Sequence, residues 1–534
     1  MRTRGFLCIV LHAHLPYIRH PEHDNFLEET WLFEAITETY IPLLDMFERL
    51  IHDSVDFRIT ISLSPTLVEM FHDPLLQQRY RHYLGKMIAF TEQELSRIKG
   101  DVHFEPVVTM YHERFRRILH LYEDVYKRDL VSAFENMSGT GKVELITTTA
   151  THAFLPVLSH CPQAVRAQIL IGAEQHREKF CGKLRGMWLP ECGYIPGFDA
   201  LLTEAGINYF FVDTHGILHG EPTPRFGASL PVRCPSGAVA FGRDNQSAKQ
   251  VWSSIEGYPG DFWYREFYRD IGFDLDLDSL KSYLHPDGLR TFTGLKYYRI
   301  TGKTHNKKPY EREKAVKKAA EHAHHFLQSR GSQIQHLHGR LGIMPIITAP
   351  YDAELFGHWW FEGPDWLDAL FRIMHREQNN FRMITPSEYL EEVAAGCSDL
   401  QVSQPSISSW GEKGYSEVWV NETNDYVYRH LFKAADRMVL LADTFPQSEG
   451  ILRRAINQAA RELLLAQQSD WTFIMKNRTA TGYAQKRIEE HLSRFTRLYD
   501  SIISDNISAT WLGEVEERDK IFKNISYSVF RSKP

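Results

Sequence analysis

Residues able to perform acid–base chemistry follow several short apolar runs of this chain. His12 and His14 come directly after the first run, and two carboxylic acids, Glu191 and Asp352, follow later ones. Both acids are surrounded by aromatic residues, Pro and Gly, in the segments WLPECGY and PYDAELFGHWW. A pair of carboxylates in such surroundings is typical of a glycosidase site, where one attacks or activates water and the other donates a proton.

Each of these residues also has an ordinary structural explanation. A single acid after a strand is most often a helix cap or part of an ion pair, although rigid aromatic turns around Glu191 and Asp352 argue against this. His12 and His14 point to the same side of an extended chain, so they could bind a metal or donate hydrogen bonds to core or substrate. Glu144, inside an apolar run, is expected to orient a neighbour rather than to react.

The apolar runs read as buried strands. They are dense in Ile, Val, Leu, Phe and Thr rather than alternating, which is expected of strands covered on both faces. The runs are 6–11, 57–63, 143–149, 187–189, 209–212 and 342–348, with 381–384 as a further candidate. Helical patterns such as 25–50 and 312–328 lie between them. This alternation predicts a parallel α/β sheet closed as a barrel, whose strand ends bring the polar residues to one face.

Two regions depart from the alternation. The segment from about 70 to 138 is mostly helical in pattern and predicts an insertion on the barrel. The Ser-rich stretch 396–410 reads as a linker or an active-site loop, and three long helical patterns follow it, at 424–443, 450–468 and 483–503. We therefore expect a catalytic barrel over 1–395 and an α-helical C-terminal domain over 396–534 that completes the cleft.

Composition excludes several classes of protein. The 534 residues carry 61 Lys+Arg against 68 Asp+Glu, a net charge of −7, which is unsuited to nucleic acid. No apolar run approaches 18 residues, so no membrane partner is expected, and the apolar start reads as a strand rather than a signal peptide. The six scattered cysteines form no disulfide pattern and favour a reducing cytoplasm. An aromatic content of 13% leaves room for sugar-stacking platforms.

Five segments in order resemble the motifs of glycoside hydrolase family 57, most closely those of its α-1,4-glucan branching enzymes. They are HAHLP at 12–16, GKVEL at 141–145, WLPECGY at 188–194, YDAELFGHW at 351–359 and AQQSDW at 466–471. The stretches YREFYRDIG at 264–272 and SWGEKGY at 409–415 also look like the branching subgroup. The resemblance covers nearly the whole chain and implies a distorted, TIM-like (β/α)7 barrel with a helical C-terminal domain.

The resemblance also implies roles for individual residues. The third motif places the nucleophile at Glu191, and the fourth places the acid/base at Asp352. The reaction implied is a double displacement on α-1,4-glucans such as amylose or glycogen that forms α-1,6 branches, as in glycogen biosynthesis. No metal or organic cofactor is implied, and we expect a monomer. The candidate substrate-binding residues are His12, His14, His152, Trp188, Trp263, Arg265, Trp359, Trp410, Trp419, Asp470 and Trp471.

One departure and two alternatives stay open. Branching members of the family carry a Tyr at the tip of a loop over the cleft, and the corresponding stretch here, Phe226–Leu230 with its neighbours, has none. An α-amylase or 4-α-glucanotransferase of the same family, with a mainly hydrolytic outcome, is therefore one alternative. The other is a metal-dependent carbohydrate deacetylase using His12 and His14, which a chelator would inactivate.

Overall fold

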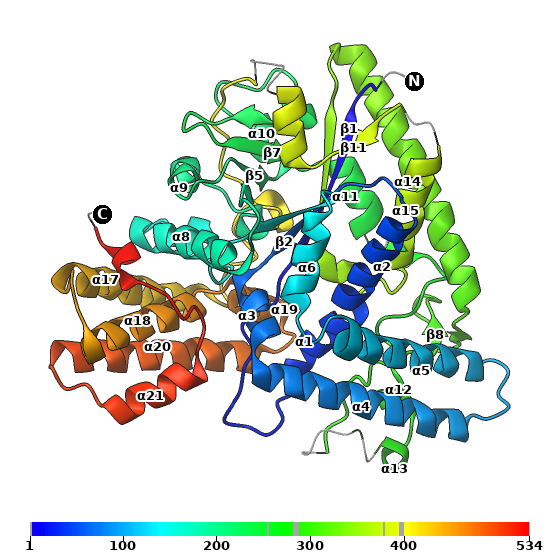
Figure 1. Ribbon diagram of the computed structural model, residues 1–534, viewed down its shortest axis with the longest axis horizontal. Coiled ribbons are helices and arrows are strands. Elements are labelled where there is room, and N and C mark those ends of the chain that lie inside the picture. The colour runs from blue at the N-terminus through cyan, green and yellow to red at the C-terminus, as the bar shows by residue number, and fades with distance from the viewer. Residues whose placement is uncertain are drawn as a thin grey trace.

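The computed structural model describes residues 3–253, 256–280, 283, 288–377, 380–394 and 400–532. At its centre is a sheet in which seven of the described strands run parallel in the order β10-β1-β2-β3-β4-β5-β7 (Figure 1). They are β1 (Phe6–Ala13), β2 (Ile59–Leu63), β3 (Val143–Thr147), β4 (Gly186–Met187), β5 (Tyr209–Val212), β7 (Val239–Gly242) and β10 (Ile346–Asp352). A parallel bridge between Arg243 and Thr348 links the two ends. The predicted distorted (β/α)7 barrel is confirmed. Between β7 and β10 the described residues close it through this bridge alone.

Two short strands extend this sheet. β6 (Val232–Arg233) pairs antiparallel with β7, and β11 (Arg382–Met383) pairs parallel with β1. All eight residues of β1 are buried, as the unbroken apolar run predicts for a strand covered on both faces. α14 (Arg312–Leu341) extends further than predicted and is capped by Gly342 with a φ of 69°. The strand expected at 342–348 begins only at Ile346, because residues 342–345 form the turn that follows this cap.

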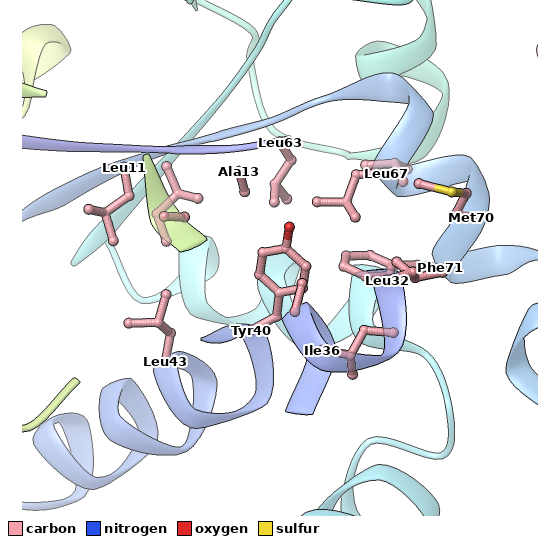
Figure 2. Close-up of a cluster of buried hydrophobic side chains, with 14 of the residues drawn as sticks. Leu11, Ala13, Leu32, Ile36, Tyr40, Leu43, Leu63, Leu67, Met70 and Phe71 are labelled. Atoms are coloured by element: carbon pink, nitrogen blue, oxygen red, sulfur yellow. The ribbon is translucent and has the colours of Figure 1, made fainter. Parts of the chain in front are cut away.

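Helices surround the barrel and extend from it. The predicted helix at 25–50 is present as α1 (Glu29–Ala35), a π-helical turn (Ile36–Tyr40) and α2 (Ile41–His52). Further helices around the sheet are α3 (Pro65–His72), α8 (Pro162–Lys179), α9 (Phe198–Glu204), α10 (Thr214–Leu218), α11 (Asn245–Trp252) and α15 (Gly363–Arg376). Figure 2 shows Tyr40 pointing from the π-helical turn toward Ala13 and Leu63 at the ends of β1 and β2, and its hydroxyl donates to Glu354.

The helical region expected at about 70–138 divides into two parts. α4 (Pro74–Arg97) and α5 (Glu105–His120) pack against each other at one end of the barrel (Figure 1). α6 (Leu130–Gly139) instead packs on β3 and α2 and therefore belongs to the helical layer of the barrel. Two short helices, α12 (Ile271–Asp274) and α13 (Leu277–Leu280), lie near α4 in Figure 1.

The C-terminal helices form a bundle beside the barrel (Figure 1). They are α17 (Tyr428–Thr444), α18 (Gly450–Ala466), α19 (Ser469–Asn477), α20 (Thr481–Ile503) and α21 (Ala509–Arg518). The expected boundary at 395/396 and Cys397 lie outside the described residues. The described part of the Ser-rich stretch, 400–410, runs along the barrel: Gln404 pairs with Glu221, and Ser408 pairs with Tyr194. No helix among the described residues is long and apolar enough to cross a membrane.

Candidate active site

The candidate residues meet at the carboxyl ends of the barrel strands. Asp352 is the last residue of β10 and lies in register with His12 on the neighbouring strand β1. His12 contacts His152 from the loop after β3, with 2.9 Å between their Nε2 atoms. Glu191 follows β4, and one of its carboxylate oxygens lies 3.9 Å from His152 Nδ1. The convergence predicted for parallel strands therefore brings both acids and the histidines to one mouth of the barrel.

The backbone around Glu191 presents its carboxylate in a constrained conformation. Glu191 has a φ of 61° and Cys192 a φ of 51°, in the left-handed region that such residues seldom adopt. A Cβ added at Gly193 would lie 2.6 Å from the Phe154 ring, so only glycine fits there. The Pro and Gly of this motif therefore allow the tight turn that aims Glu191 into the mouth.

Two hydrogen bonds hold the Glu191 carboxylate. The Trp410 indole donates to Oε2 at 2.8 Å, and the Ser469 hydroxyl donates to Oε1 at 3.2 Å. Burial raises the pKa of Glu191 to about 7, although these two donors oppose the increase. Since both donors come from beyond residue 400, the segment after the barrel completes the setting of this carboxylate.

Asp352 has a different environment. Within the part of the chain that the structure describes, no group donates a hydrogen bond to its carboxylate. Burial raises the pKa of Asp352 well above its usual range, and the negative charges of Glu354 and Glu191 add to this. Asp352 is therefore suited to hold a proton at neutral pH, whereas Glu191, with two donors and a pKa of about 7, ionises more readily. Such divergent environments separate an acid from a nucleophile.

Three histidines stack beside Glu191, with His12 and His152 buried and His14 partly exposed. The rings of His14 and His152 lie 3.8 Å apart, and those of His12 and His152 lie 4.9 Å apart. His14 Nε2 lies 3.0 Å from the Asp470 carboxylate, and the His14 backbone N–H donates to Glu354. The predicted group of His12, His14, His152 and Asp470 is therefore assembled by segments far apart in the sequence.

His14, His152 and Asp470 place ligand-type atoms within 4.8 Å of one another, a spacing that could hold a metal ion. Nδ1 of His152 lies 2.9 Å from the Ser469 hydroxyl, and Nε2 lies 2.9 Å from His12 Nε2. Both ring nitrogens of His152 therefore take part in hydrogen bonds, and so do both of His12, whose Nδ1 lies 3.2 Å from the Ser62 hydroxyl. This hydrogen bonding leaves His12 and His152 no free ring nitrogen for a metal, which argues against the deacetylase alternative.

We accordingly predict that activity on α-glucan survives prolonged treatment with a chelator. Both chemical steps need only carboxyl groups, and the histidines are engaged with one another and with Ser469. The measurement is the initial rate before and after dialysis against chelator, with metal content determined in parallel. Loss of activity that returns on adding a divalent metal would support the deacetylase alternative.

Exposed indoles lead away from Glu191. The Trp410 ring lies 6.4 Å from Trp252, which in turn lies 6.1 Å from Trp359. Trp252 and Trp359 are 43% and 45% exposed, so both offer a free face to a sugar ring. Trp188 is fully buried between His12 and Trp410, at 5.0 and 4.9 Å, and forms the floor beneath them.

Other predicted binding residues are placed differently. Trp419 stacks on Phe154 at 4.2 Å and is 1% exposed. Trp471 is fully buried, and its indole donates to the Leu465 carbonyl at 2.9 Å. A sugar stacks only on an exposed ring face, so the expectation that Trp419 and Trp471 bind substrate is corrected: both are core residues, and the buried Trp188 likewise offers no face to a sugar.

Trp263 and Arg265 also differ from expectation. The Trp263 ring is covered by Arg299 and Lys314, whose charged groups lie 4.7 and 5.0 Å from its centre. Arg265 is buried and donates to Glu38 at 2.8 Å and to the His358 carbonyl at 3.0 Å. Its described contacts fix the segment that carries Trp359 and do not reach the carboxyl pair.

Sequence reasoning missed several residues that the structure brings to the mouth. Arg243 follows the short strand β7, its guanidinium lies 5.2 Å over the Trp410 ring, and its charge opposes the increase in the Asp352 pKa. Arg243 also bonds Asp213, which is 3.0 Å from His215 Nδ1. The other missed residues are Trp252 and Ser469. Only the four-residue apolar run before Arg243 could have indicated it, whereas the fifth motif already contained Ser469.

This fold and this paired-carboxyl mouth place the chain among the barrel enzymes that act on glycosidic bonds. A model of glycosyl hydrolase family 57 matches residues 8–398, and the chain belongs to that family. A second model, for the C-terminal region of 1,4-alpha-glucan branching enzymes, matches residues 430–530.

Relatives and solved structures agree with this assignment. The 1,4-alpha-glucan branching enzyme TK1436 of Thermococcus kodakarensis is 33% identical over 98% of this chain and 78% of its own length. The alpha-amylase AmyC of Thermotoga maritima is 42% identical with a TM-score of 0.92, both chains being fully covered. The branching enzyme of Pyrococcus horikoshii is 33% identical with a TM-score of 0.89, over 100% of this chain and 98% of its own.

Proposed function

We propose that this chain is a 1,4-alpha-glucan branching enzyme that works by a retaining double displacement. Glu191 attacks the anomeric carbon of an α-1,4-linked glucan while Asp352 protonates the departing oxygen. The resulting β-glycosyl ester is then opened by a glucose 6-hydroxyl, which Asp352 deprotonates, and an α-1,6 branch results. Amylose and glycogen are the proposed substrates.

The observation that carries this proposal is the contrast between the two acids. Glu191 accepts from Trp410 and Ser469, whereas Asp352 has no described donor and faces the Glu354 carboxylate. A nucleophile must be ionised and a general acid must be protonated, so the two environments suit the two roles. The likeness to proteins named as branching enzymes supports the choice of substrate and product.

A hydrolytic outcome is the second candidate. Residues 221–244 contain no Tyr, and Leu230 in this stretch packs against the same apolar cluster as Trp410. The Thermotoga maritima protein that this chain resembles at 42% identity is named an alpha-amylase. Transfer and hydrolysis share the glycosyl ester and differ only in whether a sugar hydroxyl or water opens it.

Proton NMR of amylose during incubation with the protein separates the two candidates. We expect the α-1,6 anomeric signal to grow while the number of reducing ends stays nearly constant, because transfer makes a branch without releasing a new end. Iodine staining of the same samples should fall as long linear chains disappear. Reducing ends that grow without α-1,6 signals would support the amylase candidate instead.

A further inference from the structure

An unbroken row of four hydrogen bonds leads from the barrel interior to Glu191. Ser62 in β2 lies 3.2 Å from His12 Nδ1, and His12 Nε2 lies 2.9 Å from His152 Nε2. His152 Nδ1 lies 2.9 Å from the Ser469 hydroxyl, which lies 3.2 Å from Glu191 Oε1. We call Ser62, His12, His152 and Ser469 the relay. Three of its members come from the barrel and the last comes from the first turn of α19.

The carboxylate at its end gives the relay a direction. An ionised carboxylate only accepts hydrogen bonds, so the Ser469 hydroxyl donates to Glu191 and must accept from His152 Nδ1–H. His152 Nε2 is then an acceptor, so His12 donates from Nε2 and accepts from Ser62 at Nδ1. Every proton of the relay therefore points toward Glu191 when that group is ionised.

The relay is buried and uncharged. Its four members are at most 3% exposed. Burial lowers the pKa of both His12 and His152 well below its usual range, so neither imidazole is charged at neutral pH. Its effect on Glu191 therefore comes from aligned hydrogen-bond dipoles, which strengthen one another where water is excluded.

We propose that Ser469 is a positioning residue which, backed by the relay, aims the Glu191 carboxylate and keeps it ionised. This inference rests on the proposed role of Glu191 as nucleophile. It also gives the C-terminal helical region a chemical task, because α19 supplies the hydroxyl and the segment at 400–410 supplies the Trp410 indole. Substrate contact by Ser469 is not required for this role.

The test uses α-maltosyl fluoride as donor, because fluoride leaves without a proton and the acid limb of the pH profile then reports the nucleophile. Ser469→Ala removes the donor, so kcat/KM should fall about 10- to 100-fold, the usual effect of losing a hydrogen bond to a charged group. The acid limb should move to higher pH by about one unit. Ser469→Thr keeps a hydroxyl and should restore the limb.

The acid limb of the pH profile reports the pKa of Glu191 only if the charged groups around Glu191 keep their positions in each variant. These groups are Asp470, His14, His152 and Asp352, the last of which has Arg243 beside it. Thr472→Val is the matched control, because Thr472 lies in the same helix and donates to the Ser469 carbonyl at 3.1 Å without entering the relay. Its acid limb should stay in place even if its Tm falls.

Ser62→Ala tests the relay from its other end and lies in β2, away from α19. It should move the acid limb in the same direction as Ser469→Ala but by less. The relay would be overturned if the acid limb of the pH profile were unchanged in both Ser469→Ala and Ser62→Ala. If the wild type were active and Glu191→Gln inactive in the same experiment, the proposed function would still stand. Wild-type protein inactive on glucan would overturn the proposed function itself.

Discussion

Replacing Glu191 by Gln is expected to abolish branching and hydrolysis together. Gln keeps the size of the side chain, and its single amide oxygen can still accept from either Trp410 or Ser469, but it cannot form the glycosyl ester. Since both outcomes pass through that ester, both rates should fall by about 10⁴-fold or more, the order expected for removal of a covalent nucleophile. Rates of α-1,6 formation and of reducing-end release on amylose measure the two outcomes.

Glu144→Gln is the matched control for this substitution. Glu144 is a carboxylate of the same barrel, but it accepts from Tyr209 at 2.7 Å and from Ser387. These partners fix it within the barrel, so Glu144→Gln should lower the Tm while keeping most of the activity. If instead Glu191→Gln were nearly as active as wild type, the nucleophile would have to lie elsewhere.

Replacing Asp352 by Asn is expected to stop the reaction on amylose but not on an activated donor. The variant lacks the proton donor, so glucan turnover should fall by about 10²- to 10⁴-fold, the usual contribution of a general acid. α-Maltosyl fluoride needs no proton to lose its leaving group and should still glycosylate Glu191. Azide, which needs no general base, should then release the sugar from the ester.

The configuration of the azide product distinguishes the two roles. In Asp352→Asn, azide opens a β-linked ester, so the product should be an α-glycosyl azide. In Glu191→Ala, azide would displace fluoride directly and give the β-anomer. Proton NMR of the isolated azides shows the anomer, and the reverse pattern would mean that the roles of Glu191 and Asp352 are exchanged.

The sequence was sufficient for the parts of the fold and site that depend on local pattern. Strands such as β1 and β5 are continuous apolar runs, and Glu191 and Asp352 lie in motifs whose Pro and Gly residues fix a turn. Their meeting at one mouth follows from parallel strand order, because the carboxyl ends of such strands share a face.

The exposure of individual side chains and the contacts between distant segments depend on long-range packing, which no local sequence pattern indicates. Trp419 and Trp471 are of the residue type that commonly stacks on sugar rings, yet they are buried against Phe154 and the Leu465 carbonyl. Whether an indole faces solvent or core is decided by partners far away in the sequence. For the same reason the contact of Ser469 with Glu191, across 278 residues, could not be predicted from either segment alone.

The covalent intermediate tests the central claim most directly. Asp352→Asn incubated with α-maltosyl fluoride should accumulate a glycosyl ester, because the base that assists its breakdown is missing. Mass spectrometry of the intact protein, followed by mapping of the peptides after acid quench, locates the sugar. The account predicts one maltosyl group, on the peptide that contains Glu191. A label on any other residue, or its continued presence in a protein that also carries Glu191→Gln, would contradict it.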